Sequence, residues 1–156
     1  MDNVFNFIID ARQAFIELID SLSVEQLNQI PEGFNNNIIW NFGHIVVSTQ
    51  GLCYARTGIK SDTSFIKYLS AYAKGTKPTY IVDAEEIADL RALALSTIQH
   101  IHADYDKGVF NAITPFETST YKTSLNSIEE VLITTVGHDN LHFGYALAQR
   151  RSLNNQ

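Results

Sequence analysis

The chain has 156 residues, of which 45% are hydrophobic and 18% charged, and its net charge is −6. This length and apolar content predict one globular domain over residues 1–156 with a buried core. An excess of 17 acidic over 11 basic residues argues against a nucleic-acid partner, because phosphate binding needs clustered Lys and Arg. The single cysteine, Cys53, cannot form an internal disulfide, and no apolar run is long enough for a signal peptide or a membrane span. We therefore expect a soluble cytoplasmic protein without a membrane partner.

The first half of the sequence predicts two long helices. Apolar residues recur at steps of three and four over residues 4–22, which is the period of one buried helical face. Residues 23–34 carry a capping pattern followed by Pro and Gly, which indicates a capped turn or short helix before the chain reverses. Three asparagines at 35–37 supply N-cap acceptors for a second helix that reaches residue 57 and is apolar nearly all round. Residues 60–82 then predict a long connection with one short amphipathic helix, which can lie over one end of a bundle.

The second half predicts two more long helices. A D-x-x-E pattern starts a third helix over residues 83–108. Residues 109–126 are rich in Thr and Ser and contain a proline, so we expect a loop that accommodates a short hairpin. A capping box then starts the last helix, over residues 127–151. Each apolar face must be buried against another helix, so the predicted fold is all-α, a four-helix bundle with long connections after helices two and three.

Two lines of polar residues point to a functional site. His138 and His142 are four residues apart on the last helix, so their imidazoles project about 40° apart and can ligate one metal ion. The polar residues on this face are Thr135, His138, His142, Tyr145 and Gln149. A similar line on the second helix comprises Asn37, Asn41, His44, Ser48 and Gly51. Buried polar groups cost free energy unless they are paired, so we predict that the two lines face each other around a metal ion or a wet cavity.

Three histidine ligands would leave coordination positions open, which is typical of a reactive rather than a structural ion. Imidazole nitrogens suit zinc, nickel, copper and ferrous iron alike, so the sequence does not select the metal. The alternative is that His44 is a hydrogen-bonded core histidine and that the spacing of the His138 and His142 pair is fortuitous.

Three further residues lie about one helical turn from the candidate ligands. Asn41, Tyr145 and Ser48 are predicted to orient a ligand or to line a substrate pocket. The alternative for Asn41 and Tyr145 is an ordinary bridge between helices.

The remaining reactive residues are expected to have structural rather than chemical roles. His100 and His102 point in different directions on one helix, so we expect both at the surface or flank. Cys53 has no positive neighbour in sequence and is expected to be a small buried hydrophobic residue. Asp139 faces about 100° away from His138 and is predicted to contact another helix. No Gly-rich phosphate loop, G-x-S-x-G elbow or H-E-x-x-H motif is present, which excludes nucleotide-dependent, serine-hydrolase and zincin activities.

Two segments resemble the signatures of a known family. Asn41 to Ile45 reads NFGHI and His138 to Gly144 reads HDNLHFG, and both are similar to signature segments of the DinB-like family over essentially the whole chain. The resemblance implies a four-helix bundle that holds a divalent metal with His44, His138 and His142. It also implies relatives that are transferases or isomerases dependent on low-molecular-weight thiols such as bacillithiol, mycothiol or glutathione. Many relatives carry a glutamine after the second motif where this chain has a bulky Tyr145, which changes the predicted pocket.

These observations lead to one main hypothesis and two alternatives. The main hypothesis is a divalent-metal-dependent enzyme, a thiol-dependent S-transferase or isomerase acting on a small molecule. The first alternative is a metal-dependent hydrolase, and the second is a non-catalytic metal-binding or stress-response module. A homodimer is compatible with the apolar helix faces and with the family resemblance. The alternative is that the long connection over residues 60–82 covers the apolar surface of the second helix.

Overall fold

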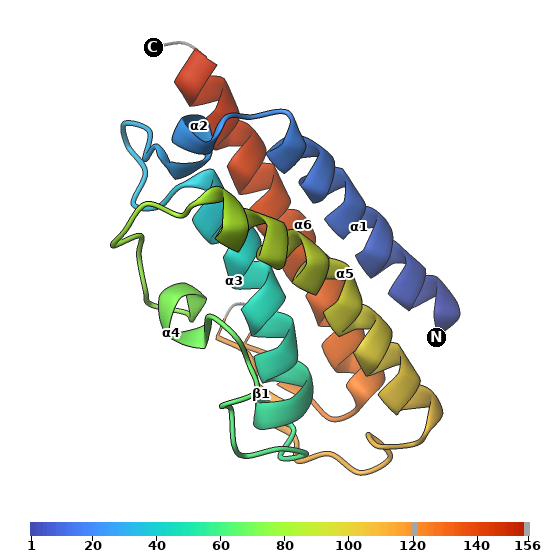
Figure 1. Cartoon of the computed structure of the whole chain (residues 1–156). Helices are drawn as coiled ribbons and strands as arrows, with labels where there is room; N and C mark the ends of the chain where they lie inside the picture. Colours follow the sequence, from blue (N-terminus) through green and yellow to red (C-terminus); the bar gives the residue numbers. More distant parts are fainter. Residues whose placement is uncertain (120–121, 155–156) are drawn as a thin grey trace.

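The computed structural model describes residues 1–119 and 122–154 and is all-α apart from one small hairpin (Figure 1). The long helices are α1 (Asp2–Asp20), α3 (Ile38–Gln50), α5 (Ala84–Asp106) and α6 (Ile128–Asn154). The short ones are α2 (Val24–Asn28), α4 (Leu69–Tyr72) and η1 (Gly51–Arg56), a π-helical turn that continues α3. Strands β1 (Phe116–Glu117) and β2 (Ser124–Leu125) pair antiparallel, with Phe116 opposite Leu125. The predicted all-α class and the short hairpin are confirmed.

Helix starts follow the capping residues of the sequence. The side chain of Asn37 accepts a hydrogen bond from the backbone N–H of Trp40 at 2.9 Å, which starts α3. Asp83 does the same for α5, and Ser23 forms a complete capping box at α2. Such caps satisfy backbone N–H groups that have no partner inside the helix, and each stabilises its helix by about 1 kcal/mol. The boundaries of these elements therefore follow from local sequence.

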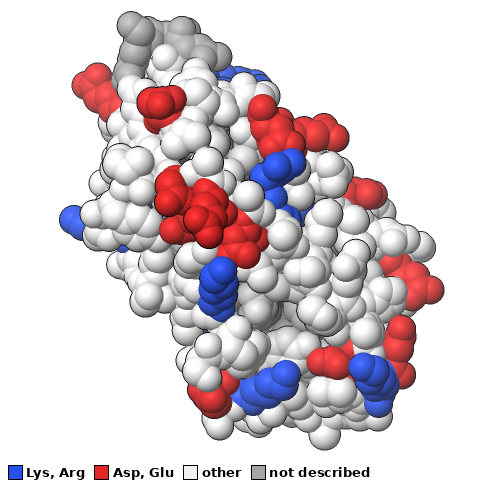
Figure 2. All heavy atoms as spheres, in the orientation of Figure 1, with Lys and Arg blue, Asp and Glu red and all other residues white. Residues whose placement is uncertain are grey.

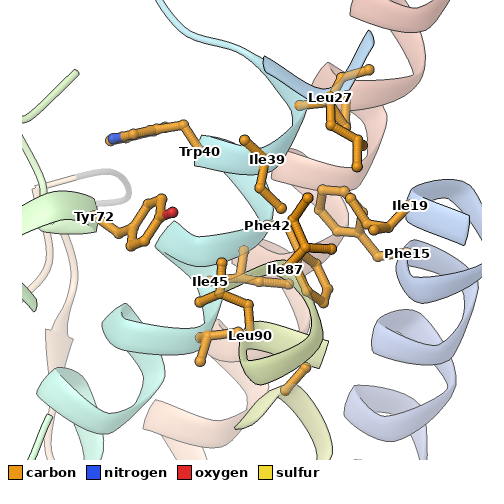
Figure 3. Packing of buried hydrophobic residues seen from close by; sticks show 14 of the residues in the cluster. Phe15, Ile19, Leu27, Ile39, Trp40, Phe42, Ile45, Tyr72, Ile87 and Leu90 are labelled. Atoms are coloured by element: carbon orange, nitrogen blue, oxygen red, sulfur yellow. The ribbon is translucent and has the colours of Figure 1, made fainter. Parts of the chain in front are cut away.

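The four long helices bury their apolar faces against one another. Both α1 and α3 pack against α5 and α6. Figure 3 shows side chains from three of these helices meeting, and the rings of Phe15 and Phe42 lie edge to face at 5.1 Å between centroids. Both rings are fully buried. Burying a side chain of this size stabilises the fold by about 1.5–3 kcal/mol, so this cluster fixes how α1 and α3 approach each other.

The connection before α5 covers one side of α3 (Figure 1). Tyr72 of α4 and Ile66 are buried and belong to the same hydrophobic cluster as Trp40 and Ile45 of α3. The indole Nε1 of Trp40 also donates to the carbonyl of Ala71 at 3.2 Å. This packing explains how a helix that is apolar nearly all round avoids exposing its outer face.

The second predicted helix changes its winding before it ends. An unbroken helix to residue 57 was expected, but the chain passes from α3 into the wider turn η1 at Gly51. Glycine has the least steric and side-chain preference for regular α-helix, which lowers the cost of such a change. Cys53 and Tyr54 lie on this wider turn, and both are buried. They belong to a second hydrophobic cluster, separate from the one that contains Trp40 and Ile45.

Acidic side chains gather over the first turns of α5 on the face drawn in Figure 2. Glu85 and Glu86 occupy the first turn of that helix, where negative charge interacts favourably with the helix dipole. Within the described residues, none of the helices combines the length and the apolar character that a bilayer crossing requires.

Candidate metal centre

Three histidines from two helices meet in the structure. His44 lies on α3, and His138 and His142 lie one turn apart on α6. One ring nitrogen from each comes within 4.8 Å of the others, and the ring centroids are 4.6–5.2 Å apart. Nitrogen atoms that share a metal ion with bonds of about 2.0–2.1 Å lie within this range of one another. The predicted cluster is therefore present, and the group could hold a metal ion.

His44 is held by a backbone carbonyl. Its Nδ1 lies 2.7 Å from the carbonyl oxygen of Tyr72, and because a carbonyl can only accept, Nδ1 carries the proton. The lone pair of the ring is then on Nε2. The hydroxyl of Ser48 lies 3.2 Å from this Nε2. The carbonyl thus fixes both the orientation and the tautomer of His44, as acceptors beside metal-binding histidines commonly do.

Close packing around Gly43 brings Tyr72 to this position. A Cβ atom at Gly43 would lie 2.6–2.7 Å from carbons of the Tyr72 ring, so only glycine lets the ring lie so close to α3. One turn before His44 on the same helix, the ring of Trp40 stacks on the imidazole, with 4.8 Å between the ring centroids and only 9° between the planes. The imidazole of His44 is therefore confined by a carbonyl on one side and an indole face on another.

His142 is oriented by Asn41. Its Nδ1 lies 2.8 Å from the Oδ1 of Asn41. The amide nitrogen of Asn41 faces the other way and donates to the backbone oxygen of Asn37 and to Gln149 Oε1, at 2.9 and 3.1 Å. The asparagine oxygen can therefore only be an acceptor for His142, which leaves Nε2 of His142 with its lone pair. The two predicted polar lines do face each other, and Asn41 is the residue that joins them.

His138 contacts a different group. Its Nδ1 and the Oδ1 of Asp139 are both buried and have no hydrogen-bond partner among the described residues, and they lie 3.9 Å apart. The other carboxylate oxygen, Oδ2, accepts from Nε of Arg12 at 2.8 Å. Asp139 therefore contacts another helix, as predicted, while its second oxygen remains close to the histidine group.

Burial keeps two of the imidazoles neutral. It lowers the pKa of His44 to about 4, with a further lowering from His138, although the bond to the Tyr72 carbonyl raises it. Burial also lowers the pKa of His142 to about 3, and the neighbouring His138 and His44 add to the effect. Metal ions bind the neutral imidazole, so at neutral pH these two side chains are in the form that binds a divalent ion. The donor set and its supporting acceptors fit such an ion.

Comparison with known proteins identifies the family of the chain. The sequence model of the DinB superfamily matches residues 8–146. The chain belongs to the DinB superfamily. No curated protein matches it. The matched range contains all three histidines, together with Asn41 and Tyr72, so the whole candidate centre of this DinB chain lies within the part that the family shares.

A buried arginine that sequence reasoning missed supports the same region. Arg12 of α1 is fully buried, and all five of its N–H groups have acceptors on the other three long helices. These acceptors are Asp139 on α6, the carbonyl of Ala94 and the hydroxyl of Thr97 on α5, and the carbonyl of Ile45 and the hydroxyl of Thr49 on α3. A signal was present in the sequence: Arg12 lies four residues after Ile8 and three before Phe15, and both are buried. A charged residue at such a position indicates a buried partner.

The other candidates lie outside the cluster. Tyr145 is 42% exposed and packs edge to face against Phe34, and within the described part of the DinB chain no contact joins it to the histidines. His102 stacks on Phe5 at 4.0 Å and His100 is exposed, as expected. Cys53 is fully buried, and burial raises its pKa to about 12, which fits the predicted hydrophobic role.

A pocket of about 280 Å³ adjoins the histidine group. His44, His138 and Ser48 are among its lining residues. A larger hollow of about 630 Å³ lies at the junction of α5 and α6 and contains none of the three histidines. Because catalysis and binding depend on the groups that line a cavity, the smaller pocket is the candidate substrate site of this DinB chain.

Proposed function

We propose that the protein is a divalent-metal-dependent enzyme, a thiol-dependent S-transferase or isomerase, in which His44, His138 and His142 hold a zinc, nickel or iron ion. The observation that carries the proposal is the orientation of the rings. Tyr72 and Asn41 accept from Nδ1 of His44 and His142, so the lone pair of each ring is on Nε2, where a metal can bind. Core histidines that are merely hydrogen-bonded do not need ring nitrogens from three side chains within 4.8 Å of one another.

A divalent ion with three protein ligands keeps open positions and lowers the pKa of a coordinated thiol or water, which makes it a nucleophile at neutral pH. The chain's own residues orient the ligands and line the adjoining pocket. Trp40 and Tyr72 restrict the movement of His44. Apolar residues line much of the adjoining pocket, and the hydroxyl of Ser48 can donate a hydrogen bond to a small-molecule substrate there.

The test measures metal content and its dependence on the histidines. Untagged wild-type protein is expected to contain or take up close to one ion per chain, and the His142→Ala variant none. His100→Ala is the matched control, because His100 is exposed and lies on another helix. Trp40 is the only tryptophan, so its fluorescence reports Co²⁺ binding beside His44. Full metal retention by His142→Ala would overturn the assignment.

Turnover assays separate the thiol-dependent reaction from its two alternatives. Activity that requires an added low-molecular-weight thiol supports the proposed transferase or isomerase. Turnover without any thiol would favour a metal-dependent hydrolase. Metal binding that raises thermal stability, without turnover of any electrophile offered, would favour a non-catalytic metal-binding or stress-response module.

We also propose a homodimer that forms through α6. Ile133, Leu141 and Tyr145 follow this helix at multiples of four residues and are 59%, 54% and 42% exposed. Exposed apolar side chains are buried when a partner packs on the same surface, which favours contact between two copies of the chain. Light scattering is expected to give a dimer mass for the wild type and a monomer mass for Leu141→Lys, and a monomeric wild type would contradict the proposal.

Two broader assignments accompany the function. We interpret the packing of α1, α3, α5 and α6 as a four-helix bundle of the DinB-like type. We also place the protein in the cytoplasm, since its single cysteine is free and buried and a reducing compartment suits such a chain.

A further inference from the structure

The pocket beside the histidine group combines apolar walls with basic residues at its rim. Its walls come from α3 and η1, from α4 and the residue after it, and from β1. The apolar members are Val47, Leu52, Ala55, Leu69, Ala73 and Phe116. His44 and His138 also line the pocket, and His44 is buried, whereas the basic residues Arg56 and Lys74 are exposed. A volume of about 280 Å³ is at the low end for small-molecule sites, so the occupant is a small molecule with an apolar body.

Arg56 and Lys74 bring two positive charges to this pocket. The guanidinium of Arg56 lies 5.0 Å from the centroid of the Phe116 ring and donates to the backbone oxygen of Glu117 at 3.1 Å. The ammonium of Lys74 donates to the hydroxyl of Ser119. These contacts hold both cations against residues 116–119 without neutralising them, and no ion pair involves either cation in the described part of the chain.

The charge balance at the rim favours an anion. Among the described residues that line the pocket, Glu117 is the only acidic one, and its backbone oxygen, not its carboxylate, contacts Arg56. Arginine and lysine together recognise carboxylates through charge-assisted hydrogen bonds. The apolar walls cannot satisfy such a group, whereas the rim can. A ligand whose charged end stays at the rim can therefore extend its apolar part toward His44 and His138.

We propose that this pocket binds an amphipathic carboxylate, with its carboxylate on Arg56 and Lys74 and its apolar chain directed at the histidine group. This proposal rests on the proposed function in one respect: it assumes that the reaction takes place at the three histidines. It names the substrate class: a small molecule that has an acidic end and a reactive group at its other, apolar end.

The first arm of the test uses metal-free protein, so that a carboxylate cannot bind through a metal. Calorimetry compares octanoate, octan-1-ol and octylammonium, which share one chain and differ in the charge of the head group. Octanoate is expected to bind about tenfold more tightly than the alcohol, as one charge-assisted hydrogen bond would give. The Arg56→Gln/Lys74→Gln double variant should lose this difference, and Glu117→Gln should bind octanoate more tightly. Lys107→Gln, which removes a lysine outside this pocket, is the matched control and should behave as the wild type.

Two outcomes of this arm would overturn the proposal. One is equal affinity for octanoate and octan-1-ol, and the other is octanoate binding that survives in the double variant. The circular dichroism spectrum of each variant checks that it is folded, and the affinity for octan-1-ol checks that the pocket itself is intact.

The second arm asks whether the far end of the ligand reaches the histidine group. Co²⁺-loaded protein is mixed with 8-mercaptooctanoate, and a thiolate-to-cobalt absorption band is expected that weakens in the double variant. A band of equal strength in the double variant would contradict the proposed orientation. Failure of the wild type to take up Co²⁺ would refute the proposed function. The octanoate result from the first arm would still show whether the pocket binds a carboxylate.

Discussion

Gly43 is the position where a single methyl group should disturb the candidate centre most. A Cβ there would lie 2.6–2.7 Å from carbons of the Tyr72 ring, whereas carbon atoms in contact are normally about 3.5–4.0 Å apart. The ring must therefore move by on the order of 1 Å in Gly43→Ala. The carbonyl of the same tyrosine accepts from His44 Nδ1, so moving Tyr72 removes or weakens the bond that orients this imidazole.

Two effects of opposite sign contribute to the stability of Gly43→Ala. Replacing glycine by alanine inside a helix normally stabilises it by about 0.5–1 kcal/mol. Overpacking a well-filled core costs about 1–3 kcal/mol, and the second effect is larger here because the ring is buried. We expect the metal-free variant to be less stable by about 1 kcal/mol and to bind metal about tenfold more weakly, the lower end of what loss of a supporting acceptor costs.

Two measurements check this reasoning. Urea unfolding gives the free energy of unfolding of the metal-free proteins, and Trp40 fluorescence gives their affinity for Co²⁺. The control is Gly144→Ala on α6, where a Cβ would meet nothing within 4 Å, so stability should stay the same or rise. If Gly43→Ala were more stable than the wild type and bound Co²⁺ equally well, the close packing of Tyr72 would have no role in the centre.

Three further predictions concern the same residues. The folded pKa values of His44 and His142 lie below their ordinary value of 6.5, so the unfolded chain binds more protons between about pH 6.5 and pH 4. The free energy of unfolding of metal-free protein should therefore fall as the pH falls through this range, by up to about 1.4 kcal/mol per pH unit for each histidine. Urea titrations at several pH values check this, and an equally steep fall in His142→Gln would contradict it. Asn41→Ala should weaken Co²⁺ binding about 10-fold to 100-fold, because His142 loses its acceptor, and unchanged affinity in a titration of Trp40 fluorescence would count against that role. The thiol of Cys53 should react with a disulfide reagent only after unfolding, because burial raises its pKa, and rapid labelling of native protein would disprove this.

The sequence was sufficient to predict the features that depend only on residues close together in the chain. Side chains such as Asp83 cap helices within one turn, and the His138 and His142 spacing places two rings on one face whatever the rest of the chain does. The polar line through Asn41 was also readable, because amides and imidazoles are unusual on a helix that is otherwise apolar.

Other parts of the site depend on contacts that leave little trace in the sequence. The acceptor for His44 is the main-chain carbonyl of Tyr72, 28 residues away, and any residue type carries such a carbonyl. Arg12 and Asp139 are 127 residues apart, so the position of each on its helix indicates a partner without showing which residue that partner is. Tyr145 shares the helical face of His142 by spacing, yet its ring turns outward to Phe34, because side-chain rotamers are decided by packing.

The ion pair of Arg12 and Asp139 also constrains how this sequence can change over generations. Losing either partner alone leaves a buried, uncompensated charge, which costs about 3–5 kcal/mol and so a large share of the stability of a typical domain. Replacing both with apolar residues of similar volume can be neutral. The two positions are therefore expected to vary together among descendants of this chain, and the charged form is preserved because every single-step route away from it passes through a poorly folding protein.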